Sequence, residues 1–191
     1  PKGHAVLSAS SSDRWLHCPP SARLCETYDD KGSDYAAEGT DAHTLCEFKL
    51  RKALGIEAED PTKSLTWFNE EMDDCATGYV AYVLEHIEAA KQVCTDPVVL
   101  IEQRVDFSRW VEGGFGTADA LIIADGTLKI CDYKHGLGVL VRAEENPQLM
   151  CYALGALELF DSIYDIETVS MTIYQPRRDT VSTYESSSAD L

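Results

Sequence analysis

One segment constrains the fold of this 191-residue chain more than any other: two apolar runs that meet at Asp125-Gly126. An Asp-Gly pair between apolar runs is the strongest short-range sign of a β-hairpin with a two-residue type I′ turn. That turn fixes the register of the two strands, so Leu121 is expected to pair with Ile130. The chain is therefore predicted to contain an antiparallel hairpin whose apolar residues share one face of a sheet.

The open end of this hairpin carries charged residues. In the register set by the turn, Asp119 lies opposite Asp132, and Lys134 lies two residues further along the same face. Directly opposed side chains have Cβ atoms about 4.5–5.5 Å apart, so two carboxylates there would raise each other's pKa unless a cation lay between them. Mg²⁺ and Mn²⁺ prefer such oxygen ligands, and two Asp and a Lys around a metal suit phosphodiester hydrolysis. Polar strand ends and a surface lysine would give the same pattern without a metal.

Two helices are expected to bring further polar side chains to this end. Gln148 and Tyr152 lie four residues apart after the hairpin, so they share a helix face and could fix the lysine or contact a phosphate. His43 and Glu47 share a face of an earlier helix and could offer one nitrogen and one oxygen ligand. Neither pair identifies a site by itself, because buried His and Tyr residues and solvated Glu residues are common.

The remaining pattern sets the fold class. Periodicity and end signals predict helices at 35–54, 65–93 and 147–160, and strands at 98–105, 169–174 and 180–184 beside the hairpin. The order of helices, three strands, a helix and two strands predicts an α/β (α+β) fold, with a central mixed β-sheet flanked by helices. We expect a single domain over 1–191, with a mainly helical part at 1–95 and a sheet core with its motif helix at 96–186. Ser187 and Asp190 have the spacing of a helix N-terminal cap, so the chain is expected to be truncated at its C-terminus.

Composition limits the classes of partner and compartment. There are 33 acidic against 16 basic residues, a net charge of −17, which argues against a protein that coats nucleic acid through bulk electrostatics. No run approaches the ~18 apolar residues of a membrane helix, and no signal peptide is evident, so no membrane partner is expected. Seven scattered cysteines without a C-x-x-C pair indicate a reduced, cytoplasmic protein.

Together these motifs resemble the PD-(D/E)XK nuclease superfamily, and within it the RecB-like exonuclease group. That group carries a helical His, G-x-x-D on one strand, D/E-x-K on the next and Q-x-x-x-Y on the following helix. The matching residues, in order, are His43, Gly116 with Asp119, Asp132 with Lys134, and Gln148 with Tyr152. More narrowly, the chain is similar to an uncharacterised family associated with phages and prophages. The resemblance covers about 7–175 and implies a restriction-endonuclease-like core.

The resemblance also implies a role for each matching residue. His43, Asp119, Asp132 and the backbone carbonyl of Tyr133 would bind Mg²⁺ or Mn²⁺, and Lys134 would position or activate the attacking water. Gln148 and Tyr152 would steady the site or the DNA strand. An additional early carboxylate could be Glu38, Glu47 or Glu102, and Glu47 is favoured because it shares a helix face with His43.

Some relatives hold a [4Fe–4S] cluster with one N-terminal cysteine and three near the C-terminus. Cys18 could match the first, but no cysteine follows Cys151, so an iron–sulfur cluster is not supported. The leading expectation is a metal-dependent DNA nuclease, in the first place an exonuclease, of phage or prophage origin. Its expected partners are DNA and a phage recombination protein. The alternative is a catalytically silent nuclease fold that binds DNA or protein in a phage complex. An acidic DNA mimic is a third reading, which explains the charge but not the opposed acids.

Overall fold

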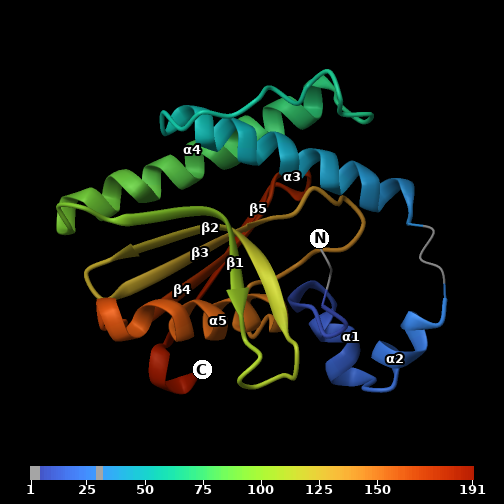
Figure 1. Ribbon diagram of the computed structural model, residues 1–191. Coiled ribbons are helices and arrows are strands. Elements are labelled where there is room, and N and C mark those ends of the chain that lie inside the picture. The colour runs from blue at the N-terminus through green and yellow to red at the C-terminus, as the bar shows by residue number, and fades with distance from the viewer. Residues whose placement is uncertain (1–4, 29–31) are drawn as a thin grey trace.

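The hairpin is the centre of a five-stranded sheet. The computed structural model describes residues 5–28 and 32–191, and the strands follow the order β1-β2-β3-β4-β5 (Figure 1). Only β3 and β4 are parallel, so the sheet is mixed, as expected for this α+β fold. The strands are β1 (Val98–Asp106), β2 (Phe115–Ala124), β3 (Thr127–Tyr133), β4 (Thr168–Gln175) and β5 (Thr180–Ser187).

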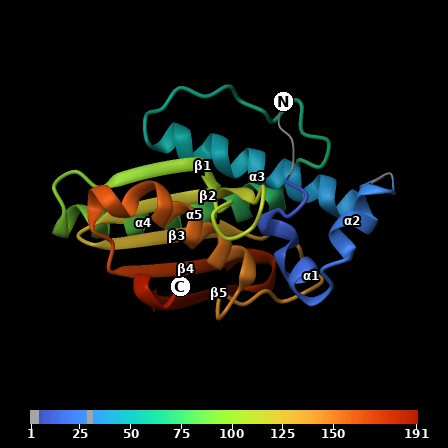
Figure 2. The ribbon, with the colours of Figure 1, turned by 60° about the horizontal axis from the view of Figure 1, so that its bottom comes forward.

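Helices cover both faces of this sheet. Figures 1 and 2 show α3 and α4 on one side and α5 on the other, with the short α1 and α2 beside one end. Helix α5 connects β3 to β4, which is the crossover that a parallel pair requires. The helices are α1 (Ser12–His17), α2 (Ser21–Glu26), α3 (Asp34–Ala53), α4 (Glu70–Val93) and α5 (Pro147–Tyr164), with short 3₁₀ turns η1 (Ala9–Ser11), η2 (Pro176–Arg178) and η3 (Ser188–Asp190).

The predicted turn of the hairpin is confirmed. Asp125 and Gly126 have φ angles of 46° and 68°, and a type I′ turn needs positive φ at both positions. Leu121 pairs with Ile130, as the register requires.

Two of the long helices differ from their predicted ends. Helix α4 begins at Glu70 rather than at 65, because Asn69 accepts a hydrogen bond from the Met72 amide as an N-terminal cap. The Trp67 amide donates to Asp41 instead of continuing a helix. Helix α5 runs past 160 to Tyr164, and it begins at the expected Asn146 cap and first-turn proline. The cap-like spacing at the end of the chain is present as a 3₁₀ turn, where the Ser187 hydroxyl lies 2.8 Å from Asp190.

The sheet separates two apolar cores. The face toward α5 carries Leu121 and Ile130 of the hairpin, which pack with Leu149. The opposite face buries Ile122 and Tyr133 against α3 and α4. Within the described ranges, no helix combines the length and the apolar character that crossing a bilayer requires.

Candidate active site

The candidate site lies where the two strands of the hairpin separate. Their register is the predicted one, but the paired ladder ends with Ala120 opposite Cys131, one position before Asp119 and Asp132. The reason is that Asp119 Oδ2 accepts a hydrogen bond from the Tyr133 amide at 2.7 Å, so a side chain takes the place of a backbone acceptor. The gap lets groups from both faces of the sheet reach the two acids.

His43 approaches Asp119 from α3. Its Nδ1 lies 3.2 Å from Asp119 Oδ1, and the His43 side chain is 34% exposed while that of Asp119 is 12% exposed. Burial acts to lower the pKa of His43, but the Asp119 carboxylate outweighs it and raises this pKa to about 9. Burial acts in turn to raise the pKa of Asp119, and His43 and Lys134 bring it below its ordinary value.

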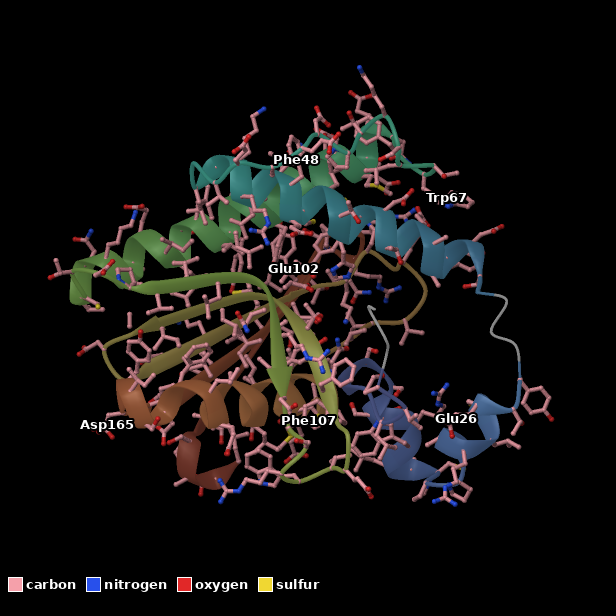
Figure 3. All side chains as sticks on the ribbon, viewed as in Figure 1. Glu26, Phe48, Trp67, Glu102, Phe107 and Asp165 are labelled. Atoms are coloured by element: carbon pink, nitrogen blue, oxygen red, sulfur yellow. The ribbon has the colours of Figure 1, made fainter. Side chains whose placement is uncertain are left out.

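Glu102 completes this cluster from β1. Ile101 pairs with Ala120 and Gln103 with Ala118, so Glu102 lies across from Asp119 at a break in the ladder. Its backbone is left-handed, with a φ of 50°, which is unusual for a residue that is not glycine, asparagine or aspartate. Figure 3 labels its side chain beneath α3. His43, Glu102 and Asp119 each place one potential ligand atom within 4.8 Å of the others.

Asp132 and Lys134 form a buried ion pair beside the cluster. Lys134 Nζ lies 2.8 Å from Asp132 Oδ2, and the Asp132 side chain is 1% exposed. Burial and the nearby Asp119 raise the pKa of Asp132, while Lys134 opposes them. Burial would lower the pKa of Lys134, but Asp132 raises it above its ordinary value, so the ammonium remains charged at neutral pH.

Gln148 of α5 fixes this ion pair. Its Oε1 accepts from Lys134 Nζ at 2.9 Å, and its Nε2 lies 3.1 Å from Asp132 Oδ1 and 2.8 Å from the Tyr152 hydroxyl. The spacing of Gln148 and Tyr152 in the sequence thus brings both to the Asp132–Lys134 pair. Burial raises the pKa of Tyr152 well above its usual range, so the phenol stays protonated.

Steric crowding explains why the first residue of the G-x-x-D motif, Gly116, is a glycine. A Cβ at Gly116 would lie 2.7 Å from Cε1 of the Tyr152 ring and 2.9 Å from the Cβ of Ala9. Only glycine lets the Tyr152 ring pack against β2 at this position, and that packing holds the hydroxyl at Gln148.

Other sequence candidates take different places. Glu47, the favoured extra ligand, forms an ion pair with Arg51 at 2.8 Å and does not belong to the group of possible metal ligands among the described residues, whereas Glu102 does. Glu38, another candidate for the early carboxylate, forms an ion pair with Arg177, whose guanidinium also contacts Glu71.

Tyr133 has roles that the motif does not reveal. Beyond its amide bond to Asp119, its hydroxyl lies 2.8 Å from Nδ1 of His135, and its ring meets His43 edge-on, with ring centroids 5.6 Å apart. The sequence gives Tyr133 only as the middle residue of D-x-K, with its carbonyl as the expected ligand. The Tyr133 ring therefore packs against the imidazole of His43, one of the possible metal ligands.

The donor set fits a hard divalent cation. Carboxylate oxygens with one imidazole suit Mn²⁺ and Mg²⁺. Asp132 Oδ2 is buried and meets Lys134 as an ion pair, yet among the described residues no donor is aligned to hydrogen-bond with it. Burying a carboxylate oxygen without an aligned donor costs free energy, and a nearby cation would offset that cost.

Comparisons with known proteins add a family and a distant structure. A family model described as "Protein of unknown function (DUF2800)" matches residues 4–191. The chain is also similar to a solved structure titled "Crystal structure of SSO0001", with 15% identity over 78% of this chain and 79% of that chain. The TM-score of 0.26 is too low to indicate a shared fold.

Proposed function

The chain belongs to the DUF2800 family, whose description names no activity, and we propose that it is a divalent-metal-dependent nuclease that hydrolyses phosphodiester bonds in DNA. The observation that carries the proposal is the grouping of His43, Glu102 and Asp119 beside the Asp132–Lys134 ion pair. Action as an exonuclease and an origin in a phage or prophage are part of the proposal and come from the motif resemblance. DNA is the proposed partner.

His43, Glu102 and Asp119 would hold Mg²⁺ or Mn²⁺, with Asp132 next to them. A cation bound there lowers the pKa of an attacking water and offsets the charge that develops on the scissile phosphate. Each ligand comes from a different element, α3, β1 and β2, so the site is rigid only in the folded domain.

Lys134 is the group best placed to handle the water or a phosphate oxygen. An ammonium has three donors, and Asp132 and Gln148 occupy two directions around Nζ. These contacts hold the side chain in one position, so its third N–H can orient a water or a phosphate oxygen. Gln148 and Tyr152 act on the reaction by positioning Lys134 and Asp132.

The net charge of −17 bears on affinity rather than on chemistry. A long-range positive field that gathers DNA is not expected from this composition. The proposed enzyme therefore binds DNA mainly through local contacts at the scissile phosphate, and a basic partner protein of a phage recombination complex would strengthen binding.

Cleavage of end-labelled DNA in Mn²⁺ or Mg²⁺ tests the proposal. Asp132→Ala, Lys134→Ala and Glu102→Gln are expected to abolish cleavage while the circular dichroism spectrum stays that of the wild type. Glu47→Gln is the matched control and is expected to cleave like the wild type, because Glu47 pairs with Arg51.

Two results would count against this assignment. Cleavage that survives Asp132→Ala and Lys134→Ala would refute these roles. Wild-type protein that binds DNA or a partner without any metal-dependent turnover would favour the catalytically silent module instead.

A further inference from the structure

A cavity adjoins the group of possible metal ligands through His135 and Tyr133. It has a volume of about 480 Å³ and is lined by Tyr35 and Glu38 of α3, by the loop 135–138 after β3, and by Arg177. His135, whose Nδ1 lies 2.8 Å from the Tyr133 hydroxyl, forms one wall, and the Tyr133 ring contacts His43 edge-on. A single side chain therefore separates this cavity from the proposed metal ligand.

The loop that forms one wall is held in place by buried hydrogen bonds. Gln175, which is 1% exposed, donates through Nε2 to the carbonyls of Gly136 and Val139, and its Oε1 accepts from the Val141 amide. Arg178 donates to the Leu137 carbonyl at 3.1 Å. The cavity is thus preformed, which is typical of a binding site.

The charges around the cavity disfavour an anionic group inside it. Arg177 is the cation of the lining, and its guanidinium lies 3.1 Å from both Glu38 and Glu71. Glu38 is also 3.5 Å from Nε2 of His135. One guanidinium shared between two carboxylates leaves no net positive charge to attract a phosphate.

The walls favour a flat, neutral ligand with polar edges. Tyr35 is 85% exposed and Leu137 is 52% exposed, so an aromatic ring and an apolar side chain are both available for contact at the rim. The floor offers carboxylate acceptors and guanidinium donors. Nucleobases combine a π-face that stacks on aromatic rings with edges that hydrogen-bond, and pockets for unstacked bases have this character.

We propose that this cavity binds one unpaired base of the DNA strand whose phosphate lies at the metal centre, an inference that rests on the proposed nuclease function. Tyr35 stacks on the base, and Glu38 and Arg177 face its polar edge. A base within a duplex cannot enter such a cavity without leaving its stack, so the substrate is single-stranded DNA or a frayed or flipped nucleotide.

Cleavage of single-stranded oligonucleotides with one abasic position moved along the strand tests this inference. For wild-type protein in Mn²⁺, an abasic nucleotide at one position near the cleaved phosphate is expected to lower kcat/KM about tenfold, as the loss of one stacked base does. Tyr35→Ala should cause a similar loss with the intact strand, and the abasic position should then cost little more, because both changes remove the same contact.

Two control variants separate stacking from structure. Tyr35→Phe keeps the ring and should retain the abasic effect that Tyr35→Ala loses. Tyr164→Ala removes a tyrosine that is 40% exposed at the far end of α5, and it should also leave the abasic effect unchanged.

The outcomes distinguish the two proposals. If Tyr35→Ala and the abasic position reduce kcat/KM independently, or if no position matters, the base-binding cavity is refuted while the nuclease function stands. If the wild type shows no cleavage that depends on Asp132, the nuclease function fails and this inference fails with it.

Discussion

Replacing Glu102 with glycine is expected to give a more stable protein than replacing it with alanine, while either change removes metal-dependent activity. Glu102 has a φ of 50° within β1, where it faces Asp119 and His43. A left-handed backbone costs about 1–2 kcal/mol for a residue with a Cβ, and glycine avoids that cost. The carboxylate, in contrast, is a proposed metal ligand, so its loss should lower kcat about 100-fold or more.

The comparison of Glu102→Gly with Glu102→Ala isolates the backbone contribution, because both variants lose the same carboxylate. Glycine within a strand is ordinarily less stable than alanine by about 0.5–1 kcal/mol. At position 102 the left-handed cost of alanine reverses this order, and glycine is expected to be more stable by roughly 0.5–1 kcal/mol. For a domain of this size that difference corresponds to about 1–4 °C in Tm.

Thermal unfolding in EDTA measures the effect without a metal. Gln103 is the matched control, since it follows Glu102 in β1 and is paired with Ala118 in the ordinary ladder. There, Gln103→Ala should be more stable than Gln103→Gly. If alanine also proves more stable than glycine at position 102, the argument that Glu102 is held at a strained position for function is wrong.

Three further predictions follow from the same site. Adding Mg²⁺ or Mn²⁺ at about 100 times its Kd should stabilise the protein by ~2.7 kcal/mol, or ~5–11 °C in Tm, and Asp119→Asn should abolish this shift in a calorimetric scan. Asp119 raises the pKa of His43 from 6.5 to about 9, so the metal-free protein should have the full stabilisation from this ion pair below pH 6.5 and lose it as the pH rises to 9. Urea unfolding across this pH range should show the decline in stability, and the decline should be absent in His43→Gln. Gly116→Ala should cost about 1–3 kcal/mol by displacing the Tyr152 ring and should also lower cleavage, whereas an unchanged urea midpoint would contradict the packing argument.

Local chemistry explains what the sequence predicts well. The Asp125-Gly126 turn and the Asn146-Pro147 helix start depend on adjacent residues only, and both are present in the structure. The shared helix face of Gln148 and Tyr152 is likewise a local property, and their side chains are hydrogen-bonded to each other.

Contacts between distant segments explain what the sequence does not predict. Glu47 is favoured by its spacing from His43, but Glu102 belongs to the cluster because β1 pairs with β2 in a particular register and breaks at this residue. Neither the register of β1 nor its left-handed residue has a turn signal that would indicate it. The ladder of the hairpin also ends one position before Asp119 and Asp132, because the Asp119 side chain accepts the hydrogen bond of the Tyr133 amide.

The residues of the proposed site lie far apart in the sequence, and this affects when the protein can become active during its synthesis on the ribosome. A chain that has emerged through Lys134 already contains every proposed metal ligand, yet Lys134 is fixed by Gln148 of α5, and β3 still lacks its neighbour β4. Domains fold as units, and sheets that depend on distant pairings form late. A nascent chain on the ribosome should therefore be inert toward nucleic acid until α5 and β4 have been made, so that the activity appears only with the folded domain.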